Sequence, residues 1–245
     1  MCGRFVRTFT VEELIEEMNE VVPSASIVSR VSDELLDPHF NVAPTTLIPV
    51  LYVENTEFVI DVMQWGFQPP KSTSGATSTM PSLVINARSE TVHEKPMFRG
   101  LLHDHRCIVP MDGFYEWNRD DASRGKIPFY VTRDDERRMW VAGLWRGKLH
   151  DPSTNGYAQV TLLTADAKSD IAHIHHRAPC QLTLDDAIHW VSDDVAPLPL
   201  VEKDHHPRLQ AWPVSKDVNS IKNNKPDLVL AVEQRVENEQ LGLFE

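Results

Sequence analysis

The chain has 245 residues, of which 41% are hydrophobic and 24% charged, a composition typical of a soluble globular protein. Acidic residues outnumber basic ones by 36 to 24, and the formal net charge of −12 argues against a uniformly basic surface, although a local basic cleft remains compatible with it. No apolar run approaches the roughly 18–20 residues that cross a bilayer, and residues 1–8 lack the apolar core of a signal peptide. We therefore expect an intracellular protein with no membrane partner.

The chain contains three cysteines, Cys2, Cys107 and Cys180. An odd, sparse set without close spacing argues against a disulfide framework and suits a reducing compartment. Cys107 lies in an apolar run and Cys180 follows a proline, so we expect both to be small buried residues rather than reactive thiols.

Helical periodicity is clearest over residues 10–22. Thr10 and Glu13 form a capping-box pattern there, and apolar residues recur on one face. The segment predicts one amphipathic helix, and the polar segment 23–38 that follows is predicted to be a loop.

Most of the remaining chain is predicted to form strands. Short runs rich in β-branched and aromatic residues cover 47–53, 58–65, 83–87, 106–111, 129–132, 139–145 and 158–165. Two later helices are expected, one from near Thr183 and a short one near Val218. Because strands and helices do not alternate, the pattern favours a β-rich α+β fold of mostly antiparallel strands with a few short helices.

Two segments fall outside this pattern. Residues 71–82 are rich in Ser and Thr and are predicted to be a flexible loop. Residues 233–245 are polar and charged until their last few positions. We therefore predict a single domain over residues 1–232 and a flexible carboxy-terminal tail over 233–245.

Cys2 would carry two nucleophiles once Met1 is removed. Initiator methionine is readily removed before a small side chain, and the new α-amine, with a pKa near 7.7–8.0, is partly unprotonated at neutral pH. An amine attacks an aldehyde to give a Schiff base, and the neighbouring thiol can close on the same carbon to form a thiazolidine. The alternative is that Cys2 is incidental, as most second-position cysteines are.

Two motifs carry polar side chains at the ends of predicted strands. Asn86 could orient an amine or a sugar and Arg88 could hold a phosphate, whereas the alternative is a turn with a solvated arginine. Glu116 stands between an aromatic pair after the run 106–111, where burial would raise the pKa of a carboxyl group toward a value suited to proton transfer. The alternative is a carboxylate that points to water.

A histidine cluster, His173, His175 and His176, leaves two interpretations open. Histidine is a proton shuttle near neutrality, and histidines two apart on a strand can also bind zinc, with His205 and His206 completing a site. No Cys-x-x-Cys or His-Glu-x-x-His pattern supports a metal site, so we predict no metal or cofactor. A zinc-dependent hydrolase remains an alternative.

Six motifs occur in an order that resembles one family. They are MCGRF (1–5), FNVAPTT (40–46), QWGF (64–67), NARSET (86–91), RCIVPMDGFYEW (106–117) and IHHRAP (174–179). The chain resembles the SRAP family of SOS response-associated peptidases, or abasic-site processing proteins, over about residues 2–232. The resemblance implies that Cys2 joins covalently to the opened sugar of an abasic site and that Asn86 positions its amine. It also implies that Glu116 transfers protons or helps to reverse the crosslink, and that His175 protonates the sugar oxygen.

The DNA-binding residues that the resemblance implies are Arg4, Pro44, Trp65, Gly66, Phe67, Arg88 and Arg177. The arginines would bind phosphates that flank the lesion, and the turn 65–67 with the proline would form the surface against which the DNA bends. We expect the rings of Trp65 and Phe67 to stack on bases. Two positions depart from the family's usual pattern, because Ala178 replaces a methionine and His176 replaces an aspartate.

The implied function is capture of abasic sites in single-stranded DNA by a monomer in the cytoplasm or nucleoid. Met1 would be removed by autoproteolysis or by an aminopeptidase, and strand incision through the Schiff base would be a lyase-like side reaction. The alternative is a non-covalent module that binds single-stranded DNA or a sliding clamp. The tail residues Gln240, Leu241, Leu243 and Phe244 resemble the short peptides by which replication proteins bind sliding clamps.

Overall fold

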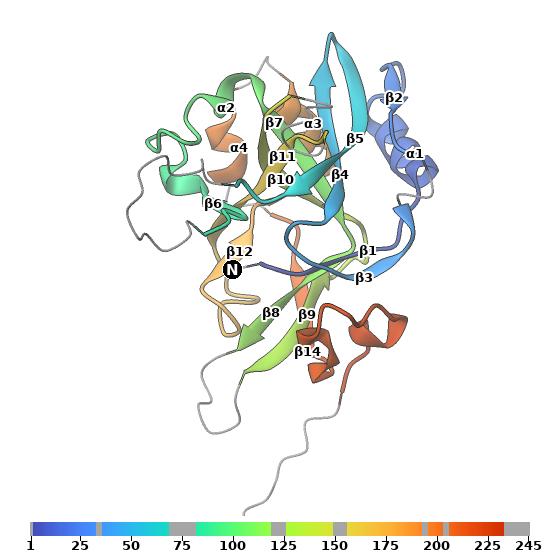
Figure 1. The fold of residues 1–245 in the computed structure, drawn as a ribbon, viewed down its shortest axis with the longest axis vertical. Helices are drawn as coiled ribbons and strands as arrows, with labels where there is room; N and C mark the ends of the chain where they lie inside the picture. The colour runs from blue at the N-terminus through green and yellow to red at the C-terminus, as the bar shows by residue number, and fades with distance from the viewer. Residues whose placement is uncertain are drawn as a thin grey trace, which may run out of the picture.

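The computed structural model describes residues 2–32, 36–68, 82–118, 126–148, 156–192, 196–202 and 206–232. In this part of the chain the strands form two sheets (Figure 1). Its strands are β1 (Phe5–Arg7), β2 (Ile27–Ser29), β3 (His39–Val42), β4 (Leu47–Glu54), β5 (Glu57–Trp65), β6 (Asn86–Arg88), β7 (Arg106–Met111), β8 (Gly113–Asn118), β9 (Ile127–Arg133), β10 (Met139–Arg146), β11 (Gln159–Asp166), β12 (Arg177–Pro179), β13 (Gln181–Leu182) and β14 (Leu209–Pro213). Its helices are α1 (Val11–Val21), η2 (Ser89–Thr91), α2 (Leu101–Asp104), α3 (Leu184–Val191), α4 (Leu198–Glu202), η4 (Lys216–Asn219) and η5 (Pro226–Val229), where η marks 3-10 turns.

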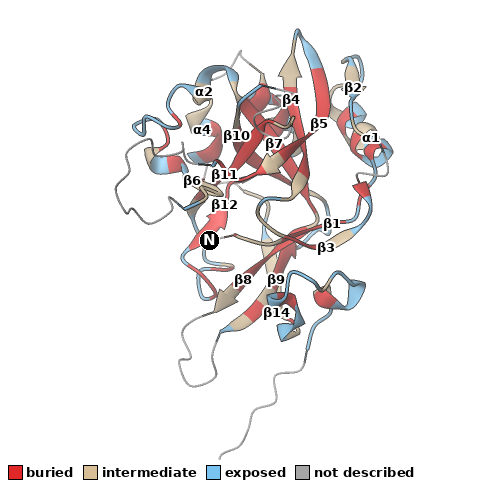
Figure 2. Ribbon diagram, in the orientation of Figure 1, coloured by how far each residue is buried: buried red, intermediate tan, exposed pale blue. Residues whose placement is uncertain are grey.

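The larger sheet closes on itself. Its strands run in the order β12-β11-β10-β7-β4-β5-β2, and β11 also pairs in parallel with β5, so that β5, β4, β7, β10 and β11 form a ring. The smaller sheet runs β14-β9-β8-β1-β3. The long strands β4, β5, β7, β10 and β11 are buried along most of their length, while many exposed residues lie on loops and on the outer faces of the helices (Figure 2). This architecture confirms the predicted β-rich α+β fold.

The first helix forms for the reasons that its sequence indicates. Glu13 N donates to Thr10 Oγ1 at 3.2 Å, and Thr10 N donates to Glu13 Oε2 at 3.1 Å, which completes the capping box. Val11, Leu14 and Met18 are the buried face of α1 and pack into the core beside α3. The predicted helix near residue 183 is also confirmed, because Thr183 caps α3.

The structure corrects several predicted boundaries. The segment 23–38 contains β2, which pairs in parallel with β5, and the predicted strand 83–87 is displaced to β6 at its carboxyl end. The short helix near Val218 is the 3-10 turn η4. Sequence patterns missed β1, β3, β8 and β12–β14 because these short strands mix apolar residues with polar, glycine or proline residues and show no clear apolar run. Met1, most of the loop 71–82 and the tail 233–245 lie outside the described residues.

Candidate active site

The cysteine at position 2 lies in the protein interior, where the two sheets meet. Main-chain pairing of β1 with β8 fixes this end of the chain, and Tyr115 N donates to Arg4 O at 2.9 Å. Cys2 is fully buried in a core cluster that also contains Phe5 and Trp65, whose ring centroids lie 5.2 Å apart. Its thiol donates to Arg4 O at 3.8 Å. The thiol is therefore held in place and shielded from solvent.

Asn86 holds the main chain of Cys2. It begins β6, which pairs in parallel with β11 through the Asn86–Leu162 register. Its Nδ2 donates to Cys2 O at 2.8 Å. Its Oδ1 is buried and accepts no hydrogen bond from any residue that the structure describes. An unsatisfied buried acceptor is costly, so this oxygen is available to a donor that enters the site.

Glu116 and His175 form a second, buried pair. Glu116 lies on β8 with 3% of its surface exposed, and His175 precedes β12 with 9% exposed. Glu116 Oε1 lies 3.8 Å from His175 Nδ1. The same imidazole nitrogen accepts a hydrogen bond from Arg177 N at 3.0 Å. The side chain of Glu116 thus points inward, and the alternative of a carboxylate that points to water is wrong.

Burial sets the charge of the groups around Cys2. It raises the pKa of the Cys2 thiol far above its ordinary value, and the negative charge of Glu116 acts in the same direction. It lowers the pKa of His175 below the ordinary value near 6.5, an effect that Glu116 partly opposes. At neutral pH the resting site therefore contains a protonated thiol and a mainly neutral imidazole. An imidazole with a pKa near or below neutrality can exchange protons with a substrate.

The three predicted phosphate ligands, Arg4, Arg88 and Arg177, differ in their exposure and in the hydrogen bonds that they make within the protein. Arg4 Nη1 donates to Asn41 Oδ1 and to Val218 O, both at 2.9 Å. Arg88 is exposed at the end of β6. The guanidinium of Arg4 is thus occupied by the protein, and Arg88 faces solvent beside Asn86.

Arg177 is the most deeply buried of these arginines, with 4% of its surface exposed. Its two Nη atoms donate to Glu90 at 2.6 and 3.0 Å, and Nη1 also donates to Asp166 Oδ1 at 2.7 Å. Glu90 and Asn41 were not selected from the sequence although both lie within motifs, because their roles depend on contacts with arginines far away in the chain.

The aromatic residues predicted to stack on DNA bases are not available for that contact. Trp65 and Phe67 are both fully buried, and Trp65 Nε1 donates to Ile85 O at 3.0 Å. The expected stacking on these two rings is therefore wrong: each ring packs in a core cluster because the closed sheet turns this end of β5 inward. Gly66 between them has φ +111°, and a side chain there would collide with Leu83. Pro44 is half-buried.

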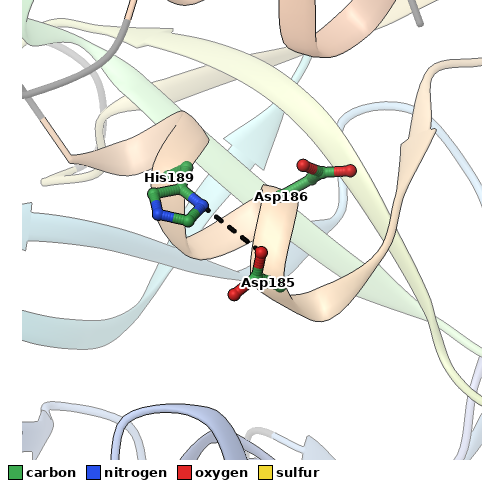
Figure 3. Close-up of side chains that lie close together, drawn as sticks. All are labelled: Asp185, Asp186 and His189. Atoms are coloured by element: carbon green, nitrogen blue, oxygen red, sulfur yellow. Dashed lines mark ion pairs between the residues drawn. The ribbon is translucent and has the colours of Figure 1, made fainter.

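The proposed zinc cluster is not assembled among the described histidines. His173 is exposed while His175 is buried, and His205 lies outside the described residues. Within the described ranges, the residues that could share a metal ion are Asp185, Asp186 and His189 on α3 (Figure 3). His189 Nδ1 lies 3.6 Å from Asp185 Oδ2 on the helix surface, which is an ordinary i,i+4 ion pair.

The protein thus has a β-rich α+β fold, and its candidate site places Cys2 beside the amide of Asn86 and near the Glu116–His175 pair. The chain belongs to the SOS response associated peptidase (SRAP) family, whose sequence model matches residues 1–221. Cys107 and Cys180 are buried in the core, as predicted. In the described part of the chain, no helix combines the length and apolarity that a membrane span requires.

Relatives are similar over nearly the whole chain. The abasic site processing protein YoqW of Bacillus subtilis (strain 168) is 31% identical over 94% of this chain and 99% of its own length. The abasic site processing protein YedK of Escherichia coli (strain K12) is 27% identical over 95% of this chain and 100% of its own. A crystal structure of a protein from Bacteroides thetaiotaomicron shares the fold, with a TM-score of 0.75, 22% identity and coverage of 95% of this chain and 100% of that one.

Proposed function

We propose that this protein captures abasic sites in single-stranded DNA by a covalent bond to Cys2 after Met1 has been removed. The observation that carries the proposal is the buried contact of Asn86 with Cys2, beside the Glu116–His175 pair. Relatives over almost the whole chain are abasic site processing proteins, which supports the same substrate. An abasic sugar is an aldehyde when its ring opens, and an aldehyde is the electrophile that an amine and a thiol on adjacent carbons capture together.

Ring opening needs a proton to leave one oxygen and another to arrive at a second. The hydroxyl on C1′ loses its proton as the bond between C1′ and the ring oxygen breaks, and the ring oxygen gains one. The protonated form of His175, which the charge of Glu116 favours, supplies the proton to the ring oxygen. Glu116, 3.8 Å from the imidazole, accepts the proton from the hydroxyl. Both groups regain their starting protonation states once a proton passes from Glu116 back to His175.

The α-amine of Cys2 then attacks the aldehyde carbon. Asn86 Oδ1 can accept a hydrogen bond from the amine, since the amide already holds Cys2 O from its other end. Loss of one water gives the imine. The S–H bond then adds across the C=N bond, with sulfur joining carbon and hydrogen joining nitrogen. This last step releases no net proton, so a thiol whose pKa is raised by burial can take part in it.

Binding of the DNA strand needs only a few phosphate contacts, which an acidic protein can supply locally. Arg88 is the predicted phosphate ligand that is exposed beside the site. Binding should weaken as salt rises, because each neutralised phosphate releases counterions.

The intact mass of the protein tests the proposal after incubation with an oligonucleotide that carries one abasic site. We expect a species without Met1 that is heavier by the oligonucleotide minus one water. The adduct should be absent with a tetrahydrofuran site, which has no aldehyde. Cys2→Ser keeps the amine but lacks sulfur, so it should yield only an imine, trapped by borohydride.

Cys180→Ala is the matched control, because it removes a thiol from the core and should still form the adduct. If the wild-type protein lacks Met1 and forms no adduct, the covalent proposal fails. Retained DNA binding in that case would favour the non-covalent module. Stoichiometric zinc that resists mild chelation would favour a hydrolase instead.

We also propose that the tail binds a sliding clamp through Gln240, Leu241, Leu243 and Phe244. These residues lie outside the described part of the chain, so their motif is the support. Deleting residues 239–245 should abolish clamp binding and leave DNA capture unchanged. Unchanged clamp affinity would refute the proposal.

A further inference from the structure

His176 presents an exposed aromatic ring directly beside the site. Its imidazole stacks on that of His175, with ring centroids 4.4 Å apart and planes inclined by 27°. His175 is buried and His176 is exposed, so the pair leads from the interior to the surface. The outer ring is thus supported on one face by the inner ring and accessible to solvent.

The backbone holds the main chain of His176 and the ring of His175 in position, and the ring of His176 stacks on the latter. His176 O accepts a hydrogen bond from Ala167 N at 3.0 Å, which extends the pairing of β11 with β12 by one residue. His175 Nδ1 accepts from Arg177 N at 3.0 Å, so the inner ring has a fixed plane. A ring fixed in this way loses little conformational entropy when another ring stacks on it.

The geometry points to His176 as the platform on which the nucleobase next to the abasic site stacks. This inference rests on the proposed function, because it takes His175 to contact the sugar of the lesion. The sugar then lies at the level of the two stacked rings. Successive bases of a strand are separated by roughly 3.4 Å, so the outer face of His176 lies within one or two stacking steps of the lesion.

An abasic site creates the need for such a platform. The missing base leaves its neighbour without a stacking partner, and base–aromatic stacking is a main source of affinity for single strands. Trp65 and Phe67 cannot supply it, because both are fully buried. Histidine rings serve as stacking surfaces for unpaired bases in the same way as larger aromatic rings.

Binding of two unreactive oligonucleotides tests this role. Both carry a central tetrahydrofuran site; one has a purine on each side of it, and the other has further tetrahydrofuran residues there. Fluorescence anisotropy would give the two dissociation constants. We expect the wild-type protein to prefer the purine-flanked strand by about tenfold, the fold-change that one stacked base contributes.

His176→Ala should abolish this preference, and His176→Phe should retain it because a flat ring remains. His173→Ala is the matched control, since it removes an exposed histidine from the same segment and should leave the preference intact. A preference that survives in His176→Ala overturns the inference. Equal weakening of both strands, which a structural role would cause, also overturns it.

Loss of the preference in His176→Phe as well as in His176→Ala would show that a flat ring at this position does not support the base, and it too would overturn the inference. These measurements need no crosslink. Failure of the proposed function appears separately, as the absence of an adduct with a natural abasic site.

Discussion

Substitutions at Arg177 and Arg88 distinguish an arginine that stabilises the fold from one that binds DNA. Arg177→Met removes the buried guanidinium and keeps most of the side-chain volume, whereas Arg88→Met removes an exposed one. Because the first guanidinium binds carboxylates of the protein and the second faces solvent, the first change should lower stability and the second should lower DNA affinity.

The expected loss of stability follows from the exposure of the groups that Arg177 binds. Removing one partner of a fully buried ion pair costs about 3–5 kcal/mol, because the other charge stays buried without a compensating partner. Here the side chains of Glu90 and Asp166 are 45% and 85% exposed, so water can solvate both after the substitution. What remains is mainly the lost charged hydrogen bond to Thr164 O, about 2 kcal/mol. In a chain of this length that corresponds to a fall in Tm of about 4–8 °C.

Thermal unfolding and the salt dependence of binding to a tetrahydrofuran oligonucleotide would measure the two effects. Arg88→Met should leave Tm unchanged and reduce the slope of log K against log salt by about 0.7, the value for one phosphate of a single strand. Arg177→Met should leave that slope unchanged. A Tm within 1 °C of the wild type (roughly the size of a surface effect) together with a reduced slope for Arg177→Met would refute the reasoning and make Arg177 a phosphate ligand.

Three further substitutions test the site and the fold. Asn86→Ala leaves Cys2 O without its donor, so single-turnover crosslinking should slow by about tenfold or more, and an unchanged rate would show that the contact is dispensable. Thr10→Ala removes the cap of α1 and should lower stability by about 1 kcal/mol, seen in a denaturant titration. The crosslinking rate should not change, because α1 packs in a different core cluster from Cys2, and a slower rate would contradict this separation. Because burial lowers the pKa of His175, the unfolded chain binds this proton more tightly than the native one, so stability should fall as pH drops below about 6.5. His175→Asn should make the loss of stability at acidic pH less steep. An equally steep loss in this variant would assign the effect to another titrating group.

Several features of the fold followed from local sequence. The α1 helix was predictable because its capping box and apolar face lie within one short segment. The long strands β4, β5, β7, β10 and β11 were predictable because each has a run of apolar residues long enough to be recognised. The closure of the sheet was not, since the parallel pairing of β11 with β5 joins segments about a hundred residues apart.

The candidate site likewise has features that the sequence predicted and features that it did not. The chemistry of Cys2, Asn86, Glu116 and His175 was inferred from residue type and from the resemblance, and the structure brings these four residues together. Their exposure was not predictable. Whether an aromatic ring faces DNA or the core depends on which neighbours cover it, and the closed sheet covers Trp65 while His176 stays exposed.

The sequence by itself determined the reactive groups of this protein and the positions of its longer elements, because side-chain chemistry and helical or strand propensity are local properties. Only the tertiary structure decided which arginines bind carboxylates and which rings are buried. It also decided that Asn86 binds the main chain of Cys2, 84 residues away in the sequence. Those outcomes depend on contacts between segments far apart in the chain, and burial, which sets the pKa of Cys2 and of His175, exists only after those segments have packed.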